Sequence, residues 1–227
     1  MMSRVAAVVP AAGRSERMGG KDKLLLPLGG KPLLAWCVDT LELSEAVDTI
    51  VIAVSPEKMR AYGRLLSERG WSKTILCQGG ARRQDSVALG LSRVSDADIV
   101  IVHDGDRPFL TRHMIEEGVS LAEREGAAVA AIPVTDTVKE TGPDEIVRRT
   151  LDRSVLRAIQ TPQVFRRDLL VRAYAMVSDD VTDDAALVEL LGYPVRLYEG
   201  ARDNLKVTTP EDLVIARAIE RSKKVNL

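Results

Sequence analysis

Four cationic side chains follow a run of small residues near the start of the chain. The small residues are Pro10, Ala11, Ala12 and Gly13, and the cations after them are Arg14, Arg17, Lys21 and Lys23. Small side chains allow a ligand to approach the backbone, whose N–H groups can bind an anion. The fixed positive charges strengthen such binding, so the segment suits a polyphosphate. The alternative is an ordinary strand-to-helix loop whose charges are solvated.

This segment matches neither of the two commonest phosphate-binding motifs. A P-loop has Lys and then Ser or Thr after its second glycine, whereas Gly19 is followed by Gly20. The dinucleotide fingerprint G-x-G-x-x-G requires a second glycine where this chain has Ser15. The segment therefore predicts an anion site that belongs to neither class.

Two further groups of polar residues follow strand-like runs. Gly79 and Gly80 allow close backbone contact with a base or ribose, and Asp85 or Ser86 is placed to cap or begin the next helix. Asp104 is placed to bind Mg²⁺, directly or through water, and Arg107 can hold a phosphate with its planar guanidinium. The alternatives are a turn with a helix cap and a charged turn that neutralises itself.

A weaker signal lies near the C-terminus. Lys206 falls within residues 203–208, which we predict to be a short apolar strand. A buried lysine is costly unless it pairs with an anion, and a side chain that reaches solvent is the usual alternative.

The segments that must position these residues alternate between strand-like and helix-like patterns. Buried strands are predicted at residues 5–9, 49–54, 73–77, 99–103 and 127–133. Helices are predicted at 32–43, 56–69, 84–93 and 111–125, and the C-terminal part adds a helix at 183–191, a strand at 195–199 and a last helix from about 209. This order predicts an α/β fold, a mostly parallel twisted sheet flanked by helices. Ligands bind beyond the carboxyl ends of such strands, which places residues 10–23, 78–83 and 104–107 on one rim.

Residues 135–150 interrupt the alternation. Two short strand-like runs flank the turn signal Gly142-Pro143-Asp144, so we predict a protruding β-hairpin arm. An isolated two-stranded hairpin is marginal in water and needs a surface to pack on. A second subunit is one candidate surface, and the chain's own domain is the other.

Composition narrows the classes of function. The chain has 227 residues, and 32 basic against 33 acidic residues give a net charge of −1. We therefore predict one domain over residues 1–227 that attracts neither nucleic acid nor membranes, and no apolar run reaches the ~18 residues of a membrane span. Two cysteines and two histidines exclude a disulfide framework and a histidine-rich metal site, so we expect a cytoplasmic protein.

The motifs together resemble the 2-C-methyl-D-erythritol 4-phosphate cytidylyltransferase family of the non-mevalonate isoprenoid pathway. The resemblance covers almost the whole chain and rests on the order and spacing of its parts. These are Pro-Ala-Ala-Gly…Arg-Met at 10–18, Gly-Gly…Arg…Asp-Ser-Val at 79–87, Val-His-Asp…Arg-Pro at 102–108, Asp-Thr-Val-Lys at 136–139, Asp-Arg at 152–153, Thr-Pro-Gln-Val-Phe at 161–165, Thr-Asp-Asp-Ala at 182–185 and Asp-Asn-Leu-Lys-Val-Thr at 203–208.

The resemblance implies a reaction of CTP with methylerythritol 4-phosphate, a Rossmann-like sheet, a Mg²⁺ cofactor and a homodimer with exchanged hairpin arms at 135–152. It assigns the catalytic cations to Arg17 and Lys23, and the positioning of the substrate phosphate to Lys206 and to Arg153 from the partner's arm. The implied CTP-binding residues are Pro10, Ala11, Ala12, Gly13, Gly79, Gly80 and Ser86. The implied substrate-binding residues are Asp104, Arg107, Thr137 and Thr161, with Asp104 also a metal ligand.

Three departures from the usual family pattern leave questions open. The family usually has Pro-Lys-Gln where this chain has Asp22-Lys23-Leu24, and the loop here is slightly shorter, so Lys21 competes with Lys23 for the catalytic role. Asp106 adds a carboxylate beside two phosphate substrates, where the family often has alanine. Ala81 replaces an aspartate found in many relatives.

Several other functions share parts of this pattern. A ribitol-5-phosphate cytidylyltransferase shares most of the motifs and differs in the alcohol pocket. Molybdopterin- or sugar-type nucleotidyltransferases share only the opening motif. A non-catalytic nucleotide-binding regulator is the alternative from a different class.

Overall fold

A seven-stranded sheet forms the centre of the protein in a computed structural model that describes residues 3–13, 22–177 and 180–225. The sheet has the strand order β11-β7-β10-β6-β1-β4-β5. Its strands are β1 (Val5–Pro10), β4 (Thr49–Val54), β5 (Thr74–Gln78), β6 (Ile99–Val102), β7 (Ala127–Pro133), β10 (Arg157–Arg166) and β11 (Arg196–Glu199). Parallel pairing joins β6, β1, β4 and β5 and also joins β7 to β11, which confirms the predicted, mostly parallel sheet.

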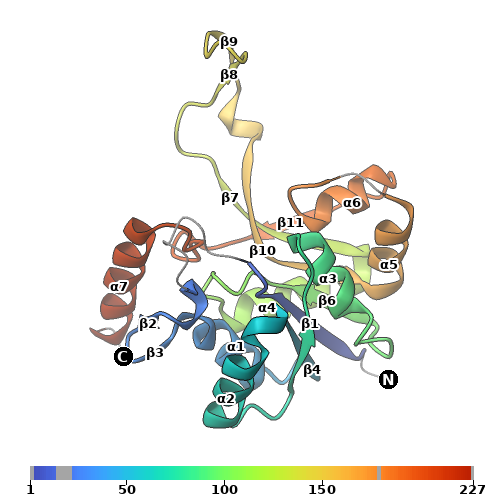
Figure 1. Ribbon diagram of the computed structural model, residues 1–227. Coiled ribbons are helices and arrows are strands. Elements are labelled where there is room, and N and C mark those ends of the chain that lie inside the picture. The colour runs from blue at the N-terminus through green and yellow to red at the C-terminus, as the bar shows by residue number, and fades with distance from the viewer. Residues whose placement is uncertain (1–2, 14–21, 178–179, 226–227) are drawn as a thin grey trace.

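Helices cover both faces of this sheet (Figure 1). They are α1 (Leu33–Leu43), α2 (Met59–Arg69), α3 (Arg83–Leu91), α4 (Arg112–Glu125), α5 (Arg167–Met176), α6 (Asp184–Leu190) and α7 (Pro210–Val225). Strand β1 shows why two cores form, because its side chains alternate between the faces. Val5, Ala7 and Val9 belong to the core under α1, α2 and α4, whereas Ala6 and Val8 belong to the core under α3, α5 and α6.

Strand β10 and helix α5 were not predicted from the sequence. Strand β10 runs antiparallel to both of its neighbours, and its pairing with β7 shifts register between Ile159 and Gln163. Pro162 lies inside that irregularity, where no ladder hydrogen bond from its nitrogen is needed. A proline within a strand-like run normally argues against a strand, which is why the pattern was missed.

The predicted strand over residues 203–208 is wrong. The backbone of this segment forms hydrogen bonds with a neighbouring loop and with side chains, and it does not pair with a strand. The N–H of Val207 donates to the carbonyl oxygen of Asp106 at 2.8 Å, and Arg107 Nη1 donates to the carbonyl oxygen of Asn204 at 2.8 Å. The segment is therefore an irregular connection that packs against the end of β6.

The predicted hairpin is present. Strands β8 (Lys139–Thr141) and β9 (Val147–Thr150) pair with each other in a two-stranded sheet of their own. They lie at the tip of an arm that extends away from the central sheet (Figure 1). Every residue of β9 is exposed, and Ile146 and Val155 also present apolar side chains to solvent. Separately, none of the described helices is long and apolar enough to cross a membrane.

Candidate active site

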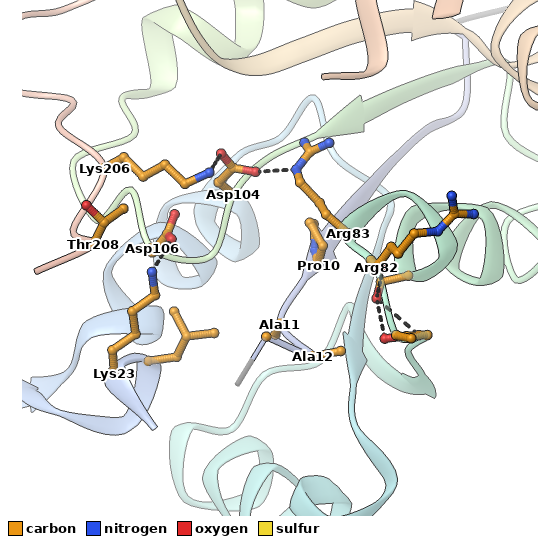
Figure 2. A pocket seen from close by; sticks show the side chains of 15 residues that line it. Pro10, Ala11, Ala12, Lys23, Arg82, Arg83, Asp104, Asp106, Lys206 and Thr208 are labelled. Carbon is orange, nitrogen blue, oxygen red and sulfur yellow. Dashed lines mark hydrogen bonds and ion pairs between the residues drawn. The ribbon is translucent and has the colours of Figure 1, made fainter. Parts of the chain in front are cut away.

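A cavity of about 690 Å³ lies at the carboxyl ends of the strands (Figure 2). Its walls come from the ends of β1, β5 and β6 and from the connection that precedes α7. The lining residues are Pro10, Ala11, Ala12, Gly13, Lys23, Leu24, Gly80, Ala81, Arg82, Arg83, Ser86, Asp104, Asp106, Lys206 and Thr208. The described parts of the three predicted rim segments therefore meet at one cavity.

Small residues form one wall because the backbone segments approach closely there. A Cβ atom on residue 79 would lie 2.6 Å from the Cβ of Ala12 and 3.2 Å from the carbonyl oxygen of Ala53, so Gly79 cannot be replaced without a shift. The N–H of Gly80 donates to Ser86 Oγ at 3.1 Å. Ser86 is buried at the start of α3 and fixes this glycine turn at the edge of the cavity.

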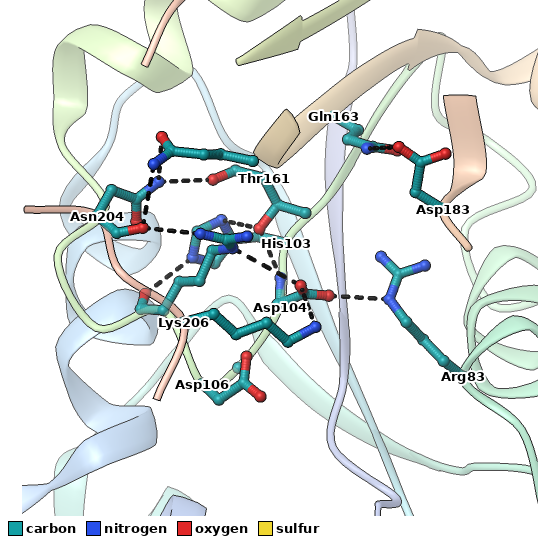
Figure 3. A network of polar contacts seen from close by, with 12 residues as sticks. Arg83, His103, Asp104, Asp106, Thr161, Gln163, Asp183, Asn204 and Lys206 are labelled. Carbon is teal, nitrogen blue, oxygen red and sulfur yellow. Dashed lines mark hydrogen bonds and ion pairs between the residues drawn. The ribbon is translucent and has the colours of Figure 1, made fainter. Parts of the chain in front are cut away.

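Asp104 forms the electrostatic centre of the opposite wall (Figure 3). Its carboxylate accepts hydrogen bonds from Arg83 Nε and from Lys206 Nζ, each at 2.9 Å. Burial alone would raise the pKa of Asp104, but the charges of Arg83 and Lys206 outweigh burial and lower that pKa well below its usual value. Asp104 is therefore ionised, and it orders two cations at the cavity.

A buried hydrogen-bond chain fixes the backbone of Asp104. Its N–H donates to Thr161 Oγ1 at 3.0 Å, and Thr161 Oγ1 lies 3.2 Å from Nδ1 of His103. The other ring nitrogen of His103 lies 3.0 Å from the carbonyl oxygen of Arg107, which can only accept. The partners thus assign the proton to Nε2, and Thr161 donates to Nδ1. Burial lowers the pKa of His103 to about 4, so the ring is neutral at pH 7.

The predicted substrate-binding residues Thr161 and Arg107 lie behind the cavity wall. Thr161 is buried and supports Asp104, as described above. The guanidinium of Arg107 binds the carbonyl oxygen of Asn204 and lies 3.7 Å from the Asp104 carboxylate. In this structure both residues join rim segments to each other and do not line the cavity.

Lys23 lies at the edge of the cavity and pairs with Asp106. The distance between Lys23 Nζ and Asp106 Oδ2 is 2.6 Å, and both side chains are largely buried. Burial and the neighbouring Asp104 raise the pKa of Asp106. The extra carboxylate that departs from the family pattern is thus directed at a predicted catalytic lysine. The competing Lys21 and the predicted Arg17 lie outside the described residues.

Arg83 is a site residue that the sequence reasoning did not select. Its guanidinium joins Asp104 to Asp184, with Nη1 2.7 Å from Asp184 Oδ2. Asp184 is almost completely buried and also accepts a hydrogen bond from the Tyr174 hydroxyl. Burial alone would lower the pKa of Arg83, but Asp184 and Asp104 raise it. An arginine in the first turn of a helix that follows a rim strand was the available signal.

The two predicted arm residues lie far from the cavity of their own chain. Thr137 precedes β8, and Arg153 follows β9, where its Nη1 donates to the carbonyl oxygen of Thr135. Neither residue lines the cavity. Within one chain, then, the structure does not bring these residues to the other predicted site residues (Figure 1).

The charges around the cavity suit a polyanion. Four cations line it, namely Lys23, Arg82, Arg83 and Lys206, against two carboxylates, Asp104 and Asp106. The net formal charge of these lining residues is therefore +2. Among the described residues there is no group of three His, Cys, Asp or Glu side chains that could hold a metal ion. The carboxylate of Asp104 has the oxygen chemistry that Mg²⁺ prefers, so it fits a cation that arrives with nucleotide oxygens.

The family assignment follows from a comparison with family models. Residues 5–222 match the model of 2-C-methyl-D-erythritol 4-phosphate cytidylyltransferase. The chain belongs to this family. The match spans the cavity, the arm and the connection before α7, so the resemblance seen in the sequence is confirmed and the enzyme class is nucleotidyltransferase.

Individual cytidylyltransferases of this name are similar over most of their length. The one from Dehalococcoides mccartyi strain 195 is 46% identical, with 95% of this chain and 96% of that protein covered. The one from Frankia casuarinae is 47% identical, with 95% and 81% covered. These values show the same family as the model does.

Solved structures from the family have the same fold. The 4-diphosphocytidyl-2C-methyl-D-erythritol synthase of Anaerococcus prevotii superposes with a TM-score of 0.87 at 27% identity, covering 96% of each chain. The cytidylyltransferase of Thermus thermophilus superposes with a TM-score of 0.78 at 34% identity, covering 97% of this chain and all of that one. The mostly parallel α/β fold is thus the family's fold.

Proposed function

We propose that this protein transfers the cytidylyl group of CTP to 2-C-methyl-D-erythritol 4-phosphate, giving 4-diphosphocytidyl-2-C-methyl-D-erythritol and pyrophosphate for isoprenoid biosynthesis. Membership of the family supports the reaction. The observation that carries the proposal in this chain is the cavity, where small residues and four cations converge at the carboxyl ends of the strands.

The substrate phosphate itself is the nucleophile in this reaction. One of its oxygens attacks the α-phosphorus of CTP, a new P–O bond forms, and the bond to the β-phosphate breaks to release pyrophosphate. Neither Cys nor His lines the cavity in the described part of the chain, and His103 is buried, neutral and engaged on both ring nitrogens. Catalysis then consists of positioning and fixed positive charge.

The nucleotide half of the cavity has the features that CTP needs. The backbone of residues 10–13 receives the triphosphate, and Lys23 contributes charge to it, together with Arg17. The turn at Gly79 and Gly80, fixed by Ser86, receives the cytidine. Pro10 has no N–H, and the N–H of Ala11 donates to the carbonyl oxygen of Ala53 at 2.8 Å, so Ala12 and Gly13 are the residues of this segment whose N–H groups would serve a phosphate.

The other half receives the alcohol phosphate. Lys206 lies beside Asp104 with part of its side chain exposed to the cavity, which suits a phosphate oxygen. Asp104 and Arg107 order this side of the rim, and Thr161 supports Asp104 from behind. Asp104 is the residue that would hold Mg²⁺, and the bound ion would neutralise charge on the triphosphate and on the departing pyrophosphate.

Thr137 and Arg153 reach a cavity only if two chains exchange their arms. The arm extends away from its own domain and exposes apolar side chains, and Ile146 is 65% exposed. A second copy that covers these side chains would supply the surface that a two-stranded hairpin lacks. We therefore propose one nucleotidyltransferase domain over residues 1–227, with residues 135–152 as a dimerisation arm. A cytoplasmic location suits this metabolic role, and both cysteines are free.

Mixed dimers test the shared site. Subunits that carry Arg153→Ala are combined with subunits that carry Lys23→Met, each of which should have strongly reduced activity on its own. One of the two cavities in a mixed dimer then has both Lys23 and the partner's intact arm, and activity should return to a fraction of that of wild type. Mixed dimers that stay inactive would contradict arm exchange.

Pyrophosphate release with each NTP and each acceptor tests the reaction. We expect release with CTP and methylerythritol 4-phosphate in the presence of Mg²⁺. Release with ribitol 5-phosphate alone would support the ribitol enzyme, and CTP binding without release would support a regulator.

A further inference from the structure

A single lysine outside the cavity joins two of the segments that form it. Lys58 ends the 3₁₀ turn Pro56–Lys58, which follows β4, the strand next to β1 in the sheet. Its ammonium donates to the carbonyl oxygen of Gly13 at 2.8 Å and lies 3.3 Å from Asp22 Oδ2. Gly13 ends the small-residue segment after β1, and Asp22 immediately precedes Lys23. Lys58 therefore connects the backbone segment and the lysine that we assign to the triphosphate.

Asp22 uses both of its carboxylate oxygens in this connection. Oδ2 accepts from the hydroxyl of Tyr62 at 3.0 Å in addition to its pairing with Lys58. Oδ1 accepts from the N–H of Leu24 at 3.3 Å, which caps the 3₁₀ turn Lys23–Leu25. Tyr62 is buried, and its pKa is raised by burial and by the charge of Asp22, so it stays a donor. A proline at position 22, as in the usual family pattern, would have no side-chain oxygen for these contacts.

We propose that Lys58 and Asp22 are positioning residues that fix Lys23 relative to the backbone of residues 10–13. The inference rests on the proposed function, in which these two elements bind the triphosphate together. Two groups that bind one ligand contribute fully to its affinity only when the distance between them already matches the ligand. Lys58 sets that separation from outside the cavity, since it is not one of the residues that line it.

Leu24 offers a competing explanation for the position of Lys23. It is buried in the core beside α1 and could anchor the turn Lys23–Leu25 without help from Asp22. In that case the Lys58–Asp22 pair would contribute only to general stability. The two explanations predict different affinities for nucleotides that differ in their phosphates.

Titration calorimetry of CTP and of CMP, each with Mg²⁺, distinguishes them. We expect Lys58→Met to weaken CTP binding about tenfold, the factor that corresponds to roughly 1.4 kcal/mol. CMP lacks the β- and γ-phosphates, so its binding does not depend on the distance between Lys23 and the backbone of residues 10–13. Its affinity should therefore change less than about twofold. Lys58→Arg keeps the charge and should restore most of the CTP affinity.

Lys31→Met is the matched control. Lys31 pairs with Asp39 at 2.6 Å, with a burial close to that of the Lys58–Asp22 pair, and does not line the cavity. We expect this variant to bind CTP as wild type does. Equal CTP affinity in wild type and Lys58→Met, or an equal loss in Lys58→Met and Lys31→Met, would overturn the inference.

Asp22→Asn provides a second route if Lys58→Met does not fold. The amide oxygen can still cap the turn at Leu24, whereas the charge that attracts Lys58 is lost. We expect a selective loss of CTP affinity here too, and an unchanged affinity would count against the inference. Unchanged CTP affinity in Lys23→Met would instead contradict the proposed role of Lys23, so the two failures are distinguishable.

Discussion

The ammonium of Lys23 lies 2.6 Å from a carboxylate oxygen of Asp106 at the edge of the cavity. The lysine that we propose to bind the triphosphate is thus paired with a buried carboxylate. The ammonium has three N–H donors, so it can keep Asp106 and still contact phosphate oxygens.

Lys23→Met should lower turnover by about a hundredfold or more, because it removes a fixed charge that acts on the triphosphate as pyrophosphate leaves. Steady-state pyrophosphate release measures the effect. Lys21→Met is the control that decides between the two lysines. A wild-type rate for Lys23→Met beside an inactive Lys21→Met would move the catalytic role to Lys21.

Asp106→Asn should strengthen CTP binding by roughly three- to tenfold, since it removes a like charge beside the triphosphate while it keeps the side chain's shape. Binding isotherms at two ionic strengths provide the measurement, and the gain should shrink at the higher one. Weaker binding by Asp106→Asn would mean that the carboxylate's hold on Lys23 outweighs its repulsion of the nucleotide.

Arg83→Met should destabilise the fold by about 3–5 kcal/mol, because it leaves the buried carboxylate of Asp184 without its cationic partner. Urea unfolding measures this change. Its neighbour Arg82 forms an exposed pair with Asp85, so Arg82→Met should leave the unfolding midpoint nearly unchanged. Equal effects of the two substitutions would show that Arg83 does not join Asp104 to Asp184.

His103 should make stability depend on pH. Burial lowers its pKa to about 4 from an ordinary value of 6.5, so between these values the unfolded chain binds a proton that the folded chain does not. The free energy of unfolding is therefore independent of His103 titration above about pH 6.5. It decreases as the pH drops from 6.5 toward 4, by about 3 kcal/mol in total.

Urea unfolding at several pH values tests this dependence. His103→Gln should flatten the slope between pH 6.5 and 4, whereas His113→Gln, at an exposed position of α4, should keep it. A slope that persists in His103→Gln would assign the dependence to other groups.

The sequence predicted the parallel half of the sheet because each of those strands is a short, buried, apolar run. Strands β4 and β7 have the predicted bounds, and the rim rule then brought Asp104 and Gly80 to one cavity. The sequence does not predict strand β10, because Pro162 interrupts the strand pattern at a register shift.

The supporting contacts of the site were harder to predict. Arg83 binds Asp184, and Lys58 binds Asp22, and each pair joins segments that only the folded chain brings together. Residue type alone makes such side chains look like solvated surface charges. The sequence argument for Lys206 rested on a predicted strand that is absent, yet its ammonium reaches Asp104 from an irregular connection.

Phosphorus NMR of the reaction products tests the central claim most directly. The protein is incubated with CTP, methylerythritol 4-phosphate and Mg²⁺, with Lys206→Met as a parallel sample. We predict pyrophosphate together with a new diphosphate-linked product that joins the cytidylyl group to the alcohol phosphate, at a strongly reduced rate in Lys206→Met. Formation of CMP and pyrophosphate without that product would contradict cytidylyl transfer.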